Sequence, residues 1–279
     1  MIRPLISACL ALAIQSFFAV QTVAAPKVED TIAQRMQACT GCHGAQGRAG
    51  PDGYYPRIAG KPAGYLYNQL LNFRDGRRHY SIMTNLLDPL SDAYLKEIAE
   101  YFASLDVPYP PPVPSSADGA LLERGRVLVI DGDSSRQLPA CIQCHGRAMT
   151  GVAPAIPGLV GLPRDYLAGQ LGSFKTGNRN AHLPDCMKQI AQRMSTEDVG
   201  AVTQWLSAQP VPAHAKPASR LTTKLPMPCG GVPGPVIEGA VDESIPSATP
   251  QVPEPPAPSS APVAPPPTTP ATATSGAKP

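Results

Sequence analysis

The sequence predicts an all-α protein made of two tandem helical domains and a proline-rich C-terminal tail. The first observation is an internal repeat at an offset of 101–104 residues, in which Tyr65-Leu66 recurs as Tyr166-Leu167 and Ser91 recurs as Ser195. The second is apolar residues at helical spacing within each repeat. The third is composition, because 18 of the 35 prolines fall in the last 69 residues. Such a segment buries too little apolar surface to offset the entropy of ordering it.

The N-terminus has the pattern of a secretory signal peptide. Arg3 precedes an apolar run from Leu5 to Val20, and small residues follow at Ala24-Ala25, where we expect cleavage. The sequence therefore predicts export from the cytoplasm. The predicted organisation is a signal peptide at 1–25, a first domain at 26–107, a proline-rich linker at 108–116, a second domain at 117–210 and a largely disordered tail at 211–279.

Three helices are expected in the first domain. The first runs over Val28–Ala38 and the second over Gly64–Phe73, each with an apolar stripe on one side. Ser91 is a good N-cap for the third helix. The repeat predicts equivalent helices in the second domain. The net charge of +2 and the lack of a basic stripe give no indication of nucleic-acid binding.

Each repeat contains one C-x-x-C-H motif. The first is Cys39, Cys42 and His43, and the second is Cys141, Cys144 and His145. This pattern is typical of covalent c-type haem attachment, in which two thiols on one helical turn bond one porphyrin and the adjacent histidine ligates the iron. A zinc ribbon also uses C-x-x-C pairs, but its pairs lie roughly 15–20 residues apart. The sequence thus predicts two haem c groups.

Methionines at equivalent places in the repeat are the predicted sixth ligands of the two irons. Met83 and Met187 each lie in an expected loop before the last helix of their domain, where the chain returns across the opposite haem face. Thioether ligation raises the reduction potential of haem iron. His79 and His182, a few residues earlier, are the alternative ligands.

Further residues are expected around each haem. A ligating histidine usually donates its second ring N–H to a carbonyl, and the candidates are the carbonyls of Pro56 and Pro157. Arg78 and Arg179 are candidates for neutralising haem propionates, because guanidinium suits carboxylates; solvated charge at a helix end is the alternative.

Two cysteines remain unassigned in the exported chain. They are Cys186, next to Met187, and Cys229. An even pair in a disulfide-permitting compartment predicts a bond between them. Such a bond would restrain the region of Met187 and shield one haem edge. The alternative is a buried Cys186 and a free or intermolecularly bonded Cys229.

These residues together resemble the di-haem cytochrome c4 family over residues 33–209. The resemblance implies two class I cytochrome c domains around a pseudo-twofold axis, with His/Met haems whose propionates approach one another. The cysteine pair and the tail depart from the family pattern. The motifs that carry the resemblance are Cys39–His43, Pro56-Arg57-Ile58-Ala59-Gly60, Tyr65–Leu70, Met83 and Leu90-Ser91-Asp92, with their equivalents in the second half.

The resemblance also implies a function, that of a non-enzymatic periplasmic electron carrier. Its expected partners are a quinol-oxidising membrane complex or dehydrogenase as donor and a terminal oxidase as acceptor. Peripheral association of the protein with the membrane is compatible with this role. One alternative is a dedicated cytochrome subunit of a periplasmic dehydrogenase or oxidase complex. A di-haem peroxidase is less favoured, because the two halves show no asymmetry that would open one iron.

Overall fold

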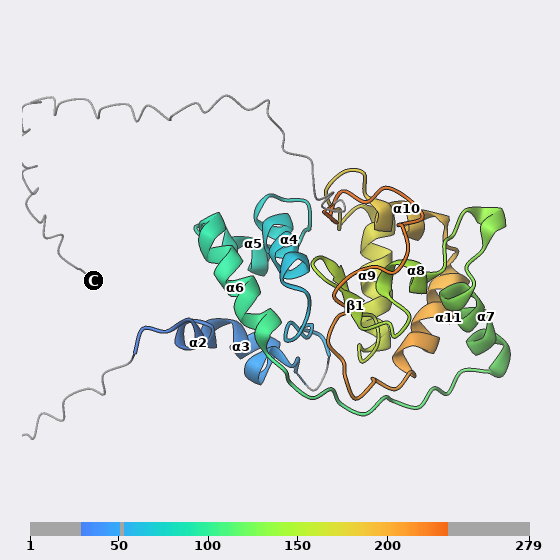
Figure 1. The fold of residues 1–279 in the computed structure, drawn as a ribbon, viewed down its shortest axis with the longest axis horizontal. Helices are drawn as coiled ribbons and strands as arrows, with labels where there is room; N and C mark the ends of the chain where they lie inside the picture. Colours follow the sequence, from blue (N-terminus) through green and yellow to red (C-terminus); the bar gives the residue numbers. More distant parts are fainter. Residues whose placement is uncertain (1–28, 51–52, 234–279) are drawn as a thin grey trace, which may run out of the picture. The chain divides into compact units, whose positions relative to one another are not determined.

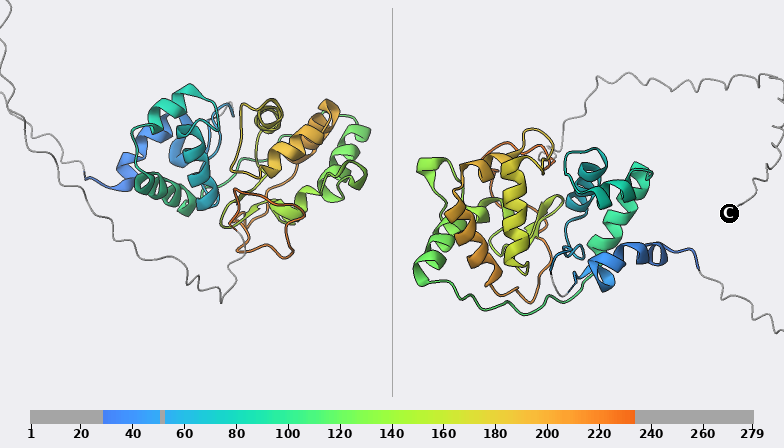
Figure 2. Two further views of the ribbon diagram at one scale, coloured as in Figure 1. Left: turned by 90° about the horizontal axis from the view of Figure 1, so that it is seen from above. Right: turned by 180° about the vertical axis from the view of Figure 1, so that it is seen from behind.

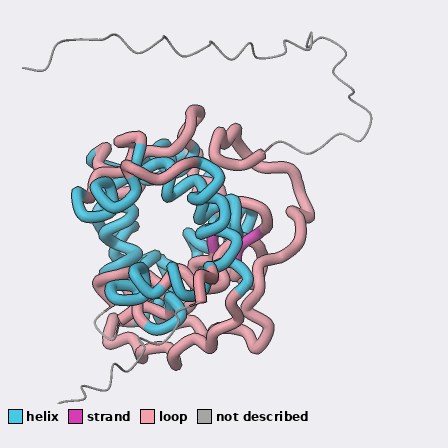
Figure 3. Tube along the Cα trace, turned by 90° about the vertical axis from the view of Figure 1, so that its left-hand side faces the viewer, coloured by secondary structure: helices cyan, strands magenta, loops and turns pink. Residues whose placement is uncertain are grey.

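The computed structural model describes residues 29–50 and 53–233, and all of them belong to one compact unit of the chain. Helices joined by loops make up nearly all of the described part (Figure 1; Figure 3). The predicted signal peptide and the predicted tail from residue 234 onward lie outside the described residues.

The first domain is helical, as predicted. Ser91 caps its last helix, because the Ser91 hydroxyl accepts a hydrogen bond of 3.3 Å from the backbone N–H of Tyr94. This N-cap prediction is confirmed. The elements are α2 (Ile32–Arg35), α3 (Gln37–His43), the 3-10 turn η1 (Ala45–Gly47), α4 (Ala63–Arg74), α5 (Ser81–Leu87) and α6 (Asp92–Ser104).

Two local predictions are wrong. The expected helix over Val28–Ala38 is split, because α2 ends before Met36 and α3 begins after it. The Met36 side chain is only 2% exposed and packs in the core of the first domain. In addition, Met83 and Met187 lie in short helices, α5 and α10, rather than in loops. Helices of seven and eight residues are too short to give a clear periodic signal.

The second domain repeats this arrangement with a longer first helix. Figure 2 shows α7 and α11 side by side, and a Cβ on Gly125 of α7 would lie 2.2 Å from the Ala201 carbonyl oxygen of α11. Only glycine allows this approach. The elements are α7 (Gly119–Ile130), η2 (Ser134–Arg136), α8 (Cys141–His145), β1 (Gly151–Val152), β2 (Ile156–Pro157), α9 (Arg164–Thr176), α10 (Cys186–Arg193) and α11 (Thr196–Ser207), with β1 and β2 antiparallel.

A buried carboxylate fixes the start of α11. Asp198 is fully buried and accepts hydrogen bonds from Arg124 at 3.0 Å and from Arg136 at 2.5 Å. Its second role is in a capping box with Ser195. Burial by itself would raise the pKa of Asp198, but the bonds from Arg136, Ser195 and Arg124 outweigh it and lower the pKa to about 2.

Two segments without helices complete the described structure. The linker after α6 is held by Arg57, whose guanidinium lies 3.7 Å from the Tyr109 ring centroid and donates to the Pro108 carbonyl at 3.2 Å. Residues 211–233 run along the second domain. There Ala218 accepts from Ala153 N–H at 2.7 Å. These residues, counted with the tail in the sequence prediction, therefore contact the second domain.

Candidate haem-binding sites

The second C-x-x-C-H motif forms a helix of its own. The five residues of α8 place Cys141 and Cys144 on one turn and end at His145, which is 7% exposed. The Nδ1 of His145 lies 2.7 Å from the carbonyl oxygen of Pro157. Because a carbonyl only accepts, Nδ1 is the donor, and the lone pair of Nε2 is free to bind a metal.

The first motif has the same geometry. His43 ends α3, is 8% exposed, and its Nδ1 lies 2.8 Å from the carbonyl oxygen of Pro56. Burial is the main cause that lowers the pKa of both histidines, and each carbonyl bond opposes it. Burial therefore favours the neutral form of both imidazoles, which is the form that ligates a metal.

The two C-x-x-C pairs do not form one zinc site. Burial raises the pKa of Cys141 to about 12 and raises that of Cys39 and Cys144. Within residues 29–50 and 53–233, no group of three or more His, Cys, Asp or Glu side chains has a metal-binding arrangement. The two motifs lie in separate domains rather than at one ribbon site.

The second motif and Met187 line the same largely apolar cavity. Cys141, Cys144 and His145 line it from α8, and Met187 lines it from α10. These residues fit a porphyrin, because the attachment thiols, the histidine and the methionine all face one apolar space. The apolar lining includes Leu159, Leu162, Leu167, Phe174, Val202 and Leu206.

In the first domain, Cys39 and Met83 border the same hydrophobic core cluster. Cys39 lies in α3 and Met83 in α5, so two separate helices bring the attachment thiol and the predicted ligand to one core. The alternative ligands differ in position. His182 lines the cavity of the second domain together with Met187. His79 lies where the domains meet, and its backbone N–H donates to Asn178 O at 2.8 Å.

Arg78 and Arg179 lie against each other at the contact between the two domains. They pair as an antiparallel bridge, and each donates to Gln69 and to Gln170, at distances of 2.7–3.0 Å. Arg179 also donates to the Tyr65 hydroxyl at 3.1 Å. The reciprocal pattern follows from the repeat. In the described residues neither arginine forms an ion pair with a carboxylate.

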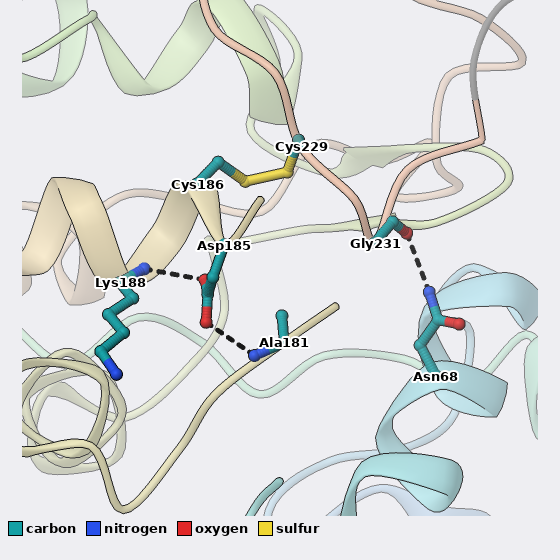
Figure 4. The surroundings of a disulfide bond; sticks show 7 residues. All are labelled: Asn68, Ala181, Asp185, Cys186, Lys188, Cys229 and Gly231. Carbon is teal, nitrogen blue, oxygen red and sulfur yellow. Dashed lines mark hydrogen bonds between the residues drawn. A yellow bond between two sulfur atoms is a disulfide. The ribbon is translucent and has the colours of Figure 1, made fainter. Parts of the chain in front are cut away.

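The structure joins Cys186 to Cys229 by a disulfide (Figure 4). Residues 225–232, here called the cover segment, line the second cavity through Leu225, Met227, Cys229, Gly231 and Val232. Gly230 N–H donates to Pro184 O at 2.9 Å. Asn68, from the first domain, donates to Gly231 O at 2.8 Å. The cover segment is thus attached to both domains.

Sequence reasoning missed three residues of this region. Asp185 caps α10 by accepting from Lys188 N–H at 2.9 Å, and its other oxygen accepts from Ala181 N–H at 2.6 Å (Figure 4). Asn68 and Lys61 reach the second cavity from the first domain. Asp185 gave a usable signal, an Asp directly before a helix. The other two gave none, because the cavity that they line belongs to the other half of the chain.

Two buried histidines, each directly after a C-x-x-C pair and each oriented by a proline carbonyl, define a di-haem c-type cytochrome. Within residues 29–50 and 53–233, none of the helices combines the length and the apolar character that a membrane span needs.

Comparison with known proteins identifies the family. The chain is 39% identical over 175 residues to a thiosulfate dehydrogenase electron acceptor of Thiomonas intermedia (strain K12), covering 62% of this chain and 79% of the relative. It is 35% identical over 174 residues to cytochrome c4 of Pseudomonas aeruginosa, covering 62% and 84%. No protein-family model matches the chain.

Solved structures are also similar to the chain. Reduced recombinant cytochrome c4 from Pseudomonas stutzeri superposes with a TM-score of 0.54 at 32% identity, covering 62% of this chain and 94% of that one. A thiosulfate dehydrogenase from Marichromatium purpuratum gives a TM-score of 0.55 at 31% identity, covering 62% and 36%. The chain belongs to the cytochrome c4 family of di-haem electron-transfer proteins.

Proposed function

We propose that this chain is a periplasmic electron carrier that takes electrons from a dehydrogenase or a membrane complex and passes them to a terminal oxidase. Haem, when bound, supplies a one-electron redox centre at each site. His43 and Met83 are the proposed axial ligands in the first domain, and His145 and Met187 are those in the second. The single observation that carries the proposal is the second cavity, which is lined by Cys141, Cys144 and His145 from α8 and by Met187 from α10.

The protein residues around this cavity suit electron transfer. The Pro157 carbonyl fixes the His145 ring, so the ligand needs little rearrangement when the iron changes charge. Apolar side chains exclude water. The crossed bonds of Arg78 and Arg179 to Gln69 and Gln170 hold the two domains in a fixed contact, which supports transfer between the two haems.

A dedicated role with one dehydrogenase is the second candidate. It is favoured by the 39% identical relative, which is named a thiosulfate dehydrogenase electron acceptor. Under this proposal, the donor docks on this cytochrome and reduces it directly, and a separate carrier or oxidase then reoxidises it.

Stopped-flow reduction tests both candidates. The oxidised two-haem protein is mixed with a thiosulfate dehydrogenase and thiosulfate, and the haem absorption is followed. Rapid reduction of both haems supports the dedicated acceptor. Slow reduction by this enzyme, together with rapid oxidation of the reduced protein by an oxidase, supports the general carrier. Turnover of hydrogen peroxide by the protein alone would contradict both.

A further inference from the structure

One lysine of the first domain contributes to the haem cavity of the second. Lys61, in the turn before α4, is only 6% exposed and lines the cavity that contains His145 and Met187. The Lys61 ammonium lies 5.9 Å from the centroid of the Tyr65 ring. No ion pair in the described residues includes Lys61.

The surroundings of Lys61 are cationic. Burial is the main cause that lowers the pKa of Lys61, and the nearby Tyr65 hydroxyl raises it in part. The positive charges of three arginines lower it further; these are Arg57, Arg179 and Arg78. The pKa of Tyr65 is affected by the same positive charges. Burial would raise this pKa, but the charges of Arg179, Lys61 and Arg78 outweigh burial and lower it to about 8. A buried ammonium beside other cations is costly unless an anion balances it.

Only the first domain has a lysine at this position of the repeat. Gly60-Lys61-Pro62 corresponds to Gly161-Leu162-Pro163, so an apolar side chain occupies the equivalent position of the second domain. Leu162 is 5% exposed and packs in the core of its own domain. No lysine therefore extends from the second domain toward the first site at this position.

We infer that Lys61 is a charge partner for the carboxylates of the second haem and raises the reduction potential of that haem. This inference rests on the proposed function, which places a haem in this cavity. Lys61 and Arg179 both line this cavity, and neither forms an ion pair with a carboxylate of the described residues, so the carboxylates of a bound haem would be their partners. A fixed positive charge favours the reduced iron, because reduction removes one positive charge from the centre. Lys61 is thus a positioning and tuning residue rather than an iron ligand.

Potentiometric titration of the two-haem protein tests the inference. The variants are Lys61→Met and Lys61→Gln, which remove the charge, Lys61→Arg, which keeps it, and Lys96→Met, which removes an exposed charge of α6. The wave of the second haem is identified by NMR of the paramagnetic haem methyl groups. We expect that wave to move to lower potential in the two neutral variants, to be restored in Lys61→Arg, and to stay in place in Lys96→Met.

Two results would overturn the inference, and each is distinct from failure of the proposed function. An unmoved second wave in both neutral variants removes the role of Lys61, as does an equal shift of both waves. In either case the parent protein still contains two haems. If instead the parent protein contains no haem in the second domain, the proposed function fails, and the inference fails with it.

Discussion

The disulfide between Cys186 and Cys229 is expected to stabilise the second domain and to restrict access to its haem. The perturbation is the double variant Cys186→Ser/Cys229→Ser, which frees the cover segment from the start of α10. The bond spans 43 residues of sequence. By the loop-entropy relation, a cross-link that closes a loop of this length lowers the entropy of the unfolded chain. This loss stabilises the folded state by about 4 kcal/mol at 25 °C.

The remaining contacts of the cover segment are weak by comparison. Gly230 N–H to Pro184 O and Asn68 to Gly231 O are single hydrogen bonds, each worth about 1 kcal/mol. We expect that these two bonds do not hold the segment in place once the disulfide is removed. We therefore expect the free energy of unfolding of the second domain to fall by up to about 4 kcal/mol, and the Met187 side of the cavity to open.

Two measurements check this prediction. Guanidinium unfolding of the two-haem protein, followed by the haem absorption, gives the loss of stability. The rate at which imidazole binds to the oxidised second haem gives the access to its cavity, and we expect it to rise. Asn68→Ala is the matched control, because it removes only the contact from the first domain and should cost about 1 kcal/mol.

An unchanged unfolding midpoint and an unchanged imidazole rate in the double variant would refute the reasoning. The same conclusion would follow if Asn68→Ala opened the cavity as much as the double variant. In that case the contact between domains, rather than the disulfide, would hold the cover segment.

The remaining predictions concern the haem ligands and the acid sensitivity of the second domain. Cys42→Ala and Cys144→Ala should each remove one of two haems and unfold that half, seen in the haem-to-protein ratio and in circular dichroism; a folded half without haem would contradict this. Met83→Ala and Met187→Ala should each turn one iron high-spin and open it to carbon monoxide; if both keep the parent spectrum, His79 and His182 become the first ligands to test. The pKa of Asp198 is lowered from 3.8 to about 2, so the stability contributed by its ionised carboxylate is present above pH 3.8 and is lost as the pH falls toward 2. The variant Asp198→Asn should be less stable at pH 7 and should lose this part of the acid dependence of stability. An unaltered acid transition in the variant would exclude the role of the two arginines that bind Asp198.

The features that the sequence alone determined are local in the chain or repeated in it. The C-x-x-C-H motifs predict attachment because two thiols and a histidine within five residues share one helical turn. The N-cap at Ser91 follows from the residue type and its neighbours. The repeat predicted two similar helical domains, and the even pair of spare cysteines predicted a bond between Cys186 and Cys229, which the structure contains.

Features that join distant residues were decided only by the tertiary structure. Arg78 and Arg179 are 101 positions apart in sequence and meet because the two domains contact each other through their repeated segments. Lys61 and Asn68 reach the second cavity from the first domain, and no spacing in the chain encodes that approach. The helices around Met83 and Met187 are less than three turns long, so packing rather than periodicity determines them. Local chemistry thus identified the cofactor, whereas packing between the domains determined which charged side chains line the second cavity.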